Sequence, residues 1–233
     1  TALLLAAQGA RVLATGRDEA RLAAVARESG AATLAIALDS EAACATVIDA
    51  ARRLGPPAIL VHAAGLPGYI DRPIWEQSPA AWRQTMTVNL DAPFWLTRLV
   101  AGELRDSGAG RVVMVSSTAG QVGAPAMAPY CASKHGLLGL MRSVAQDLAP
   151  FGGTCNAVLP GWVKTPMADA DAELEAARRG LTAAAVWAER AAASPAKRIL
   201  EPLEVARVIA FLASDAAGGV NGEAVTVSLG SLW

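Results

Sequence analysis

The segment SSTAGQVGAPAMAPYCASK, residues 116–134, contains a serine, a tyrosine and a lysine whose spacing would allow them to act together in catalysis. Tyr130 and Lys134 are four residues apart, so on a helix they share one face, one turn from each other. Ser117 directly follows the apolar run RVVMVS, which predicts a buried strand. If that strand ends beside the helix, the three side chains can act on one substrate.

This trio suits proton transfer to a carbonyl oxygen. A tyrosine hydroxyl has a pKa near 10, and bringing it near neutrality takes roughly 4 kcal/mol of differential interaction. We expect the ammonium of Lys134 to supply much of this and to lower the pKa of Tyr130. The Ser117 hydroxyl can donate to the same oxygen and help stabilise the alkoxide. Taken alone, the Tyr–Lys spacing is more typical of a helix with a half-buried tyrosine and an exposed lysine.

The elements that position the trio can be predicted from periodicity. Short apolar runs alternate with capped amphipathic helices, which indicates an α/β fold with a doubly wound parallel sheet, in one domain spanning residues 1–233. Ligands of such sheets bind at the carboxyl ends of the strands. The expected strands are 11–16, 33–39, 58–65, 111–117, 154–161 and 223–228, and the expected helices are 18–30, 40–55, 78–107, 129–148, 166–193 and 201–214.

Composition narrows the class of protein. The formal net charge of the 233 residues is −1, which does not suggest a nucleic-acid partner. The apolar runs are shorter than the roughly 20 residues of a membrane span, and no signal-peptide pattern is present. We therefore expect a cytoplasmic protein. With two histidines and three cysteines that form no CxxC pair, we expect no metal site and no disulfide framework.

The segment from Ser117 to Lys134 resembles the active-site signature of the short-chain dehydrogenase/reductase family. Four further motifs occur in the family's order: LDS at 38–40 resembles the stretch near the adenine, VHAAG at 61–65 the N-N-A-G turn, VNL at 88–90 the segment of the catalytic asparagine, and LPGWVKTPM at 159–167 the nicotinamide loop. The resemblance covers essentially the whole chain. It implies a Rossmann-like fold and an NAD(P)(H)-dependent oxidoreductase, similar to ketoreductases, that interconverts a ketone and a secondary alcohol.

The resemblance also assigns roles to residues. Tyr130 would be the acid or base, Lys134 would hold the nicotinamide ribose, and Ser117 would orient the carbonyl. Asn89 would anchor a water that links Lys134 to solvent, or else it pins a kink in a helix. The substrate would contact Ser117, Tyr130 and Trp162. The implied cofactor contacts are Gly16, Arg17, Asp39, Ser40, His62, Ala63, Ala64, Gly65, Tyr130, Lys134, Pro160, Gly161, Val163 and Thr165.

The residues after the first predicted strand favour NADP(H), with NAD(H) as the alternative. An acidic residue there would bind the ribose hydroxyls and select NAD. Gly16 instead leaves room for a 2′-phosphate, and Arg17 can bind one bidentately. Alternatively, Arg17 is merely solvated or pairs with Asp18, which we expect to cap the next helix. Asp39 is expected near the adenine, or it caps a helix or closes a turn.

Three features depart from the family pattern. His62 and Ala63 replace two asparagines, and we expect His62 to be structural and bonded to backbone near the site. Ser228 and Leu229 replace residues of the usual V-D-G-G ending, in a region of subunit contact. The sequence also lacks the family's first strand and its T-G-x-x-x-G-x-G turn. We expect the chain to be part of a longer protein, with a true fragment as the alternative.

Substrate and assembly are the least determined features. Residues 162–198 correspond to the family's substrate loop, and their apolar side chains could form a lid over an apolar or aromatic ketone. The alternative, helix core or subunit contact, is favoured for two of them, Val186 and Trp187. Helices 78–107 and 129–148 are expected to form a homodimer or homotetramer. A non-catalytic cofactor-binding or scaffolding protein, or an inactive fragment, is the alternative function. The lid candidates are Trp162, Met167, Leu174, Leu181, Val186 and Trp187.

Overall fold

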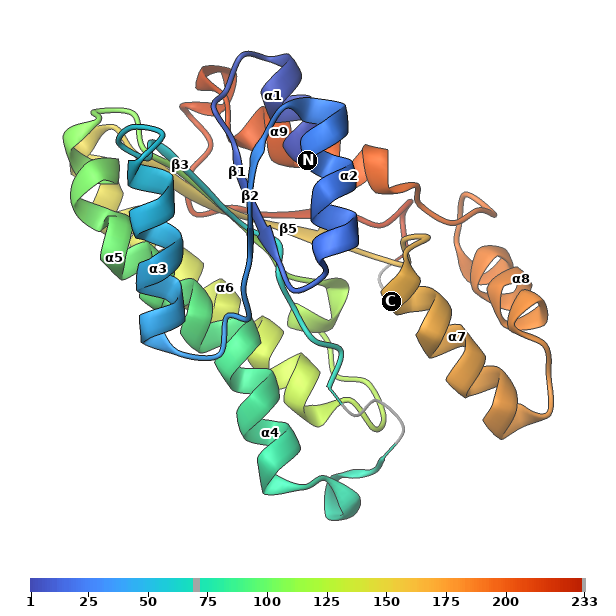
Figure 1. The fold of residues 1–233 in the computed structure, drawn as a ribbon. Helices are drawn as coiled ribbons and strands as arrows, with labels where there is room; N and C mark the ends of the chain where they lie inside the picture. Colours follow the sequence, from blue (N-terminus) through green and yellow to red (C-terminus); the bar gives the residue numbers. More distant parts are fainter. Residues whose placement is uncertain (69–71, 232–233) are drawn as a thin grey trace.

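The computed structural model describes residues 1–68 and 72–231, in which strands and helices alternate along the chain (Figure 1). The strands are β1 Leu13–Gly16, β2 Ala32–Ala35, β3 Ile59–His62, β4 Arg111–Val115, β5 Thr154–Pro160 and β6 Ala224–Val227. The helices are α1 Ala2–Ala7, α2 Glu19–Ser29, α3 Glu41–Arg52, α4 Pro79–Met86, α5 Ala92–Asp106, α6 Ala128–Leu148, α7 Pro166–Arg179, α8 Ala183–Ala193 and α9 Pro202–Leu212. The predicted α/β fold class is confirmed.

All strand pairs are parallel, and they form two groups. β3, β4, β5 and β6 pair in that order, whereas β1 pairs with β2 alone. In the sheet, no strand formed by the described residues lies between β1 and β3. In the short-chain dehydrogenase/reductase family, which the sequence resembles, the first strand lies at this position, between the second and the fourth, and it is the strand that the sequence lacks. A partly buried leucine from each of β1, β2 and β3 nevertheless packs against the same hydrophobic cluster, so one core spans both groups.

Helices cover both faces of the sheet, with α3, α5 and α6 on one side and α1 and α9 on the other (Figure 1). The alternation of side chains along β4 shows why its sequence is apolar throughout. Val112 and Met114 are buried in the cluster under α5 and α6, and Val113 is buried in the cluster under α9. Helices α7 and α8 extend beside the carboxyl end of β5 (Figure 1).

Three predicted elements differ in detail from the structure. The helix expected at 166–193 is two helices, because Gly180 adopts a left-handed conformation with φ 66° and ends α7. The strand expected at 33–39 ends at Ala35. The long helix at 78–107 is continuous in direction but contains a π-helical segment, Thr87–Asp91, between α4 and α5. Such π segments are often found at functional sites.

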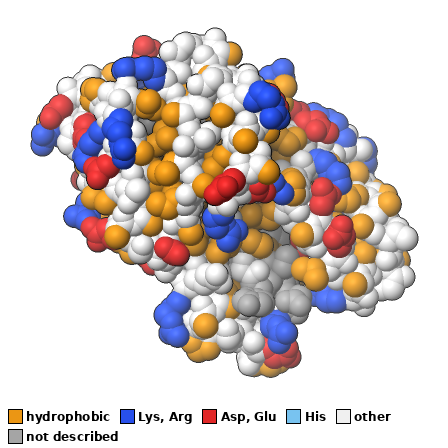
Figure 2. Space-filling view, in the orientation of Figure 1, with side chains coloured by type: hydrophobic (Ala, Val, Ile, Leu, Met, Phe, Trp, Pro, Cys, Tyr) orange, Lys and Arg blue, Asp and Glu red, His pale blue; other side chains and the backbone are white. Residues whose placement is uncertain are grey.

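The surface in view mixes the two signs of charge with hydrophobic side chains (Figure 2). Within the described ranges, no helix combines the length and apolar character needed to cross a membrane. In the same residues, no three His, Cys, Asp or Glu side chains gather in a way that could hold a metal ion.

Candidate active site

The predicted trio does come together. Strand β4 ends at Val115, and Ser117 follows it at the start of a short 3-10 turn, Thr118–Gly120. Helix α6 carries Tyr130 in its first turn and Lys134 one turn later. The Ser117 hydroxyl lies close enough to Tyr130 to favour the ionised form of the tyrosine, and both side chains line one pocket. A carbonyl oxygen placed between them could therefore accept a hydrogen bond from each hydroxyl group, as general acid catalysis requires.

Lys134 lies beneath Tyr130. Its side chain is buried, its Nζ donates to the carbonyl oxygen of Val115 at 2.9 Å, and Nζ lies 5.6 Å from the centre of the Tyr130 ring. Burial lowers the pKa of this ammonium from 10.5 to about 8. An ammonium has three donors, and the described residues accept only one hydrogen bond from Nζ. Lys134 can thus donate to a further polar group in the site.

The pKa of Tyr130 differs from the sequence-based expectation. Burial raises the pKa above the ordinary value of 10.0, while the hydrogen bond with Ser117 acts in the opposite direction. The prediction that Lys134 lowers this pKa is wrong for this structure. The physical reason is that the protein desolvates the phenolate, while Nζ lies 5.6 Å from the ring centre and donates to the Val115 carbonyl. Tyr130 is therefore protonated at neutral pH and can donate.

Asn89 holds the loop after β3 against helix α6. It lies in the π-helical segment, and its Oδ1 accepts from the Leu66 amide at 2.7 Å. Its Nδ2 donates to the Leu66 carbonyl at 2.9 Å and to Ser133 Oγ at 3.0 Å. Ser133 in turn donates to the Tyr130 carbonyl at 2.8 Å. Asn89 thus sits at a helix irregularity and positions the backbone on both sides of the site.

Two glycines lie beside Lys134, and one of them permits a close approach. A Cβ on Gly65 would lie 3.6 Å from Lys134 Nζ and would occupy space beside it. A Cβ on Gly120 would lie 2.7 Å from Ser116 Oγ and 3.0 Å from the Lys134 carbonyl oxygen. Gly120 is therefore required for the turn after Ser117 to pack on α6. Sequence reasoning did not single out Gly120, although a glycine shortly after the serine was a usable signal.

His62 is directed away from the trio. Its imidazole is buried, with Nε2 3.0 Å from the Thr97 hydroxyl of α5, and burial lowers its pKa to about 3. Its partner is a side chain, so the expectation of a backbone partner is wrong. The neighbouring Ala63 and Ala64 are exposed at the carboxyl end of β3. These alanines, and not the imidazole, lie where a cofactor could pass.

The edge formed by β1 and β2 presents the residues predicted to bind the adenosine end of a cofactor. Gly16 ends β1, and the exposed Arg17 follows it. Asp18 caps α2 and pairs with Arg21 at 3.0 Å, which rules out the expected alternative of an Arg17–Asp18 pair. In the described part of the chain Arg17 has no ion-pair partner.

Asp39 and Ser40, which follow β2, have different roles. Asp39 is exposed. The cap of α3 is Ser40, whose Oγ accepts from the Ala43 amide at 3.3 Å, so the alternative role of Asp39 as a helix cap is wrong. The Asp39 carboxylate is therefore free to face a ligand.

The loop after β5 connects the sheet to α7. It begins at Pro160, and a Cβ on Gly161 would lie 3.1 Å from Ser228 Cβ, so this glycine permits close packing on the C-terminal segment. Val163 forms a parallel bridge with Leu200. The Thr165 hydroxyl caps α7 by accepting from the Ala168 amide at 3.3 Å. These contacts fix the loop in front of Tyr130.

A pocket opens in front of the two hydroxyl groups. Most of its lining is apolar, and among the predicted lid residues Trp162 and Met167 contribute to it. Leu174 and Leu181 are exposed and do not line it. Its lining is Pro67, Ser117, Thr118, Ala119, Met127, Tyr130, Gly161, Trp162, Met167, Ala168 and Asp171.

Two other lid candidates hold α7 and α8 together. Val186 is fully buried with two alanines of α7, which agrees with the alternative of helix core. Trp187 packs edge-on against Trp162, with ring centres 6.3 Å apart, and donates from Nε1 to Asp169 at 3.0 Å. The 162–198 segment is thus a small packed unit rather than an open loop.

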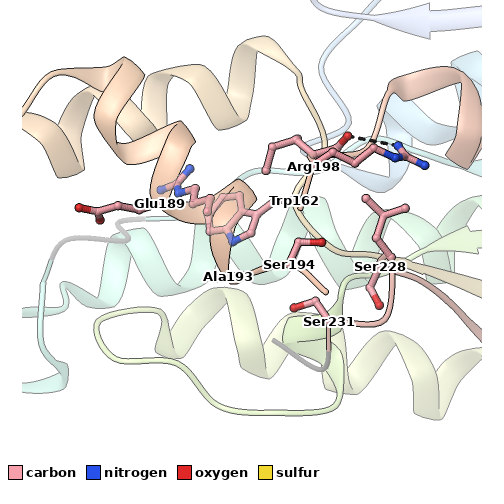
Figure 3. Close-up of a pocket in the computed structure, with 10 residues that line it drawn as sticks. Trp162, Glu189, Ala193, Ser194, Arg198, Ser228 and Ser231 are labelled. Atoms are coloured by element: carbon pink, nitrogen blue, oxygen red, sulfur yellow. Dashed lines mark hydrogen bonds between the residues drawn. The ribbon is translucent and has the colours of Figure 1, made fainter. Parts of the chain in front are cut away.

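Arg190 of α8 fixes Trp162 in place. Its guanidinium lies 3.6 Å from the centre of the Trp162 ring, and Nη2 donates to Asp171 at 2.6 Å and to Glu175 at 2.7 Å. Behind Trp162 is a second pocket, which Figure 3 shows with Ser194 and Ser228 among its lining residues. Trp162 lines both pockets and forms part of the boundary between them.

Comparison with known proteins places this geometry in context. A family model described as enoyl-(acyl carrier protein) reductase matches residues 1–231. A Streptomyces virginiae protein named as the ketoacyl reductase of a monensin polyketide synthase is 37% identical over 235 residues, which cover 97% of this chain and 89% of the relative. The acetoacetyl-CoA reductase of Rhizobium meliloti is 35% identical over 232 residues, covering 98% and 91%.

A solved structure of similar shape is that of an actinorhodin polyketide ketoreductase variant with NADPH. It superposes with a TM-score of 0.92 at 33% identity and covers 99% of this chain and 91% of its own. A levodione reductase gives a TM-score of 0.89 at 29% identity, covering 99% and 91%. The arrangement of the described strands and helices is therefore shared with reductases of carbonyl compounds.

Proposed function

Because the chain belongs to the short-chain dehydrogenase/reductase family and is an NAD(P)(H)-dependent oxidoreductase acting on ketones and secondary alcohols, we propose that it is an NADPH-dependent ketone reductase with Tyr130 as proton donor. The meeting of the Ser117 and Tyr130 side chains in one pocket lining carries this proposal. It brings both hydroxyl groups to one end of a mostly apolar pocket. A non-catalytic or scaffolding role is not favoured by any observation.

The residues at the carboxyl edge fit a nicotinamide cofactor. The Lys134 ammonium is buried and has donors to spare, and Gly65 leaves open the space beside it that a Cβ would take. Ribose hydroxyls are suitable acceptors for such an ammonium. We assign Lys134 to the nicotinamide ribose and the 160–165 loop to the nicotinamide. When bound, the cofactor supplies the hydride that the carbonyl carbon receives.

Residues of the chain position and protonate the carbonyl oxygen of the substrate. Ser117 donates a hydrogen bond to the substrate carbonyl and holds it beside Tyr130. Tyr130 is protonated at neutral pH, because burial raises its pKa, and it donates the proton to the oxygen as negative charge develops. Lys134, whose Nζ donates only one hydrogen bond to the described residues, keeps its other donors for the ribose. Asn89 keeps the loop at Leu66 and the first turn of α6 in fixed register.

The preference for NADP over NAD is supported by the free arginine. Arg17 is exposed at the end of β1, and Asp18, the nearest carboxylate in sequence, is engaged with Arg21. A guanidinium without a competing carboxylate can bind a 2′-phosphate bidentately. Gly16 adds no side chain that would exclude the phosphate. We therefore assign the 2′-phosphate to Arg17.

The substrate and the assembly are proposed from surface character. The pocket lining, with Met127, Trp162 and Met167, suits an apolar or aromatic group next to the ketone. Phe94 of α5 and Trp82 of α4 are large exposed side chains on the helices predicted to form a subunit contact. A homodimer or homotetramer would cover them. The cytoplasmic location stays a prediction.

The test is a spectroscopic assay of NADPH oxidation by the full-length protein with a panel of aryl and alkyl ketones. The proposal expects turnover of at least one neutral apolar or aromatic ketone, with a higher kcat/KM for NADPH than for NADH. Binding of NADPH without turnover of any ketone, or of the matching alcohols with NADP, would refute the catalytic proposal. Equal use of the two cofactors would refute only the NADP assignment.

A further inference from the structure

We propose that Asp171 is a specificity-determining residue, which makes the enzyme select neutral, hydrogen-bond-donating ketones and reject ketones that carry a second, anionic group. The inference rests on the proposed function, since it concerns the same pocket. It is carried by the position of one carboxylate in an otherwise uncharged lining. Such a residue acts on substrate choice and takes no part in the proton transfer.

Asp171 lies on α7 and lines the pocket together with Ser117 and Tyr130. Its side chain is 19% exposed, so it is largely enclosed but not cut off from the pocket. One oxygen, Oδ2, accepts from Arg190 Nη2 at 2.6 Å. Among the described residues, none donates a hydrogen bond to the other oxygen, Oδ1. A bound ligand can therefore reach a carboxylate oxygen that still accepts hydrogen bonds.

The neighbouring charges do not neutralise this carboxylate. Arg190 is shared, because its Nη2 also donates to Glu175 at 2.7 Å. Glu175 and Glu189 both pair with Arg179. The connected cluster thus contains three carboxylates, Asp171, Glu175 and Glu189, against two guanidinium groups. Its formal charge is −1, and Asp171 is the member that lines the substrate pocket.

Two nearby lysines, Lys164 and Lys134, do not offset the negative charge of this cluster. Lys164 is engaged with Asp169, and its Nζ packs over the ring of Trp187. Lys134 is buried under Tyr130, with a pKa lowered to about 8, and it does not line the pocket. Arg190 Nη1 has no hydrogen-bond partner among the described residues, but it is buried and Arg190 does not line this pocket. An anionic group on the substrate would therefore meet Asp171 without a compensating partner in the lining. A hydroxyl or amide N–H at the same place would find an acceptor.

The effect should be large enough to measure. Two like charges about 6 Å apart at the effective dielectric constant of a partly enclosed site repel strongly enough to change binding by roughly tenfold or more. An amide of the same shape avoids the repulsion and can donate to Oδ1. The comparison of a carboxylate with its primary amide therefore isolates charge from size.

The experiment measures kcat/KM of the full-length protein, with NADPH, for acetylbenzamide and acetylbenzoate, each as the meta and the para isomer. At neutral pH the benzoate is ionised. We expect the amide to be preferred by about tenfold or more in at least one isomer pair. A ratio near one in both pairs would overturn the inference without recourse to any variant.

Two matched variants assign the effect to the residue. Asp171→Asn keeps the shape and can still accept from Arg190, and we expect its amide-to-acid ratio to fall close to one. Glu175→Gln removes the same unit of charge from the cluster but none from the pocket lining, and we expect its ratio to fall much less than that of Asp171→Asn. Equal changes in both variants would overturn the assignment to Asp171.

Failure of this inference can be told from failure of the proposed function. If the wild type reduces neutral ketones and treats the acid and the amide alike, only the role of Asp171 is wrong. If it reduces no ketone in the wider panel, the proposed function itself is wrong. Melting temperatures of both variants within a few degrees of the wild type would show that a changed ratio does not come from a loosened fold.

Discussion

The ammonium nitrogen of Lys134 lies 5.6 Å from the centre of the Tyr130 ring, and burial shifts the two groups in opposite directions. It lowers the pKa of Lys134 to about 8 and raises the pKa of Tyr130. The tyrosine is therefore held protonated, while the lysine remains mostly cationic near neutrality. This state is suited to donating a proton to a carbonyl oxygen, which is the direction of ketone reduction.

Burying the Lys134 ammonium should destabilise the folded protein. The pKa of Lys134 is lower in the folded state than the ordinary 10.5, so between about pH 8 and pH 10.5 the unfolded chain binds more protons. Stability therefore rises with pH across this window, and the full cost, of order 3 kcal/mol, is present below it. We expect Lys134→Met to abolish turnover yet to unfold at a higher denaturant concentration than the wild type near pH 7.

The pH dependence provides the control for this variant. Near pH 9.5 the wild-type lysine is largely neutral in the folded state, so the stability advantage of Lys134→Met should shrink by more than half. Chemical denaturation of both proteins at the two pH values measures this. A variant that is less stable than the wild type near pH 7 would contradict the stated cost of burying the ammonium.

Asn89 should matter for both stability and turnover. Replacing it by alanine leaves the Leu66 amide and carbonyl and Ser133 Oγ without their partner, which costs roughly 1–3 kcal/mol and frees the loop beside the site. We expect Asn89→Ala to reduce kcat by about tenfold or more. Hydrogen exchange of residues 63–68 should quicken in the same variant.

The control is an asparagine far from the site. Asn221 accepts from the Cys155 amide at 2.9 Å and donates to the Ala145 carbonyl at 3.0 Å, so it also connects two segments of backbone. Asn221→Ala should lose a similar free energy of unfolding and keep kcat close to that of the wild type. If both variants lower kcat equally, Asn89 has no special positioning role.

Arg17 should decide between the two cofactors. We expect Arg17→Ala to lower kcat/KM for NADPH by about tenfold or more, since a charge-assisted bidentate contact is lost, and to leave kcat/KM for NADH nearly unchanged. Arg21→Ala is the matched control, because Arg21 lies one turn further along and is paired with Asp18. Both variants are assayed with both cofactors. A parallel loss with NADH would show that Arg17 acts on structure rather than on the phosphate.

Much of the fold followed from local pattern. The apolar strands, the caps at Asp18 and Ser40 and the helix carrying Tyr130 and Lys134 are signals contained within a few residues of each other. The separation of β1 from β3 was also foreseeable, because the family order places an additional strand between them. The break at Gly180 was overlooked, although a glycine after two arginines is a typical helix end.

The parts that could not be predicted depend on contacts between distant segments. Arg190 meets Asp171 and Trp162 only because α8 folds back on α7. The desolvation that raises the pKa of Tyr130 is a sum over the whole surrounding fold, whereas the sequence shows only the neighbouring lysine. The partner of His62, Thr97, is likewise set by the packing of α5 against β3.

The most direct test of the account is the turnover of Tyr130→Phe in the full-length protein. This variant keeps the ring and removes the hydroxyl that would donate the proton. We predict that kcat for reduction of a ketone accepted by the wild type falls by about a thousandfold or more, while the dissociation constant for NADPH, measured by fluorescence, changes by less than about threefold. Turnover within tenfold of the wild type would contradict the assignment of Tyr130 as proton donor.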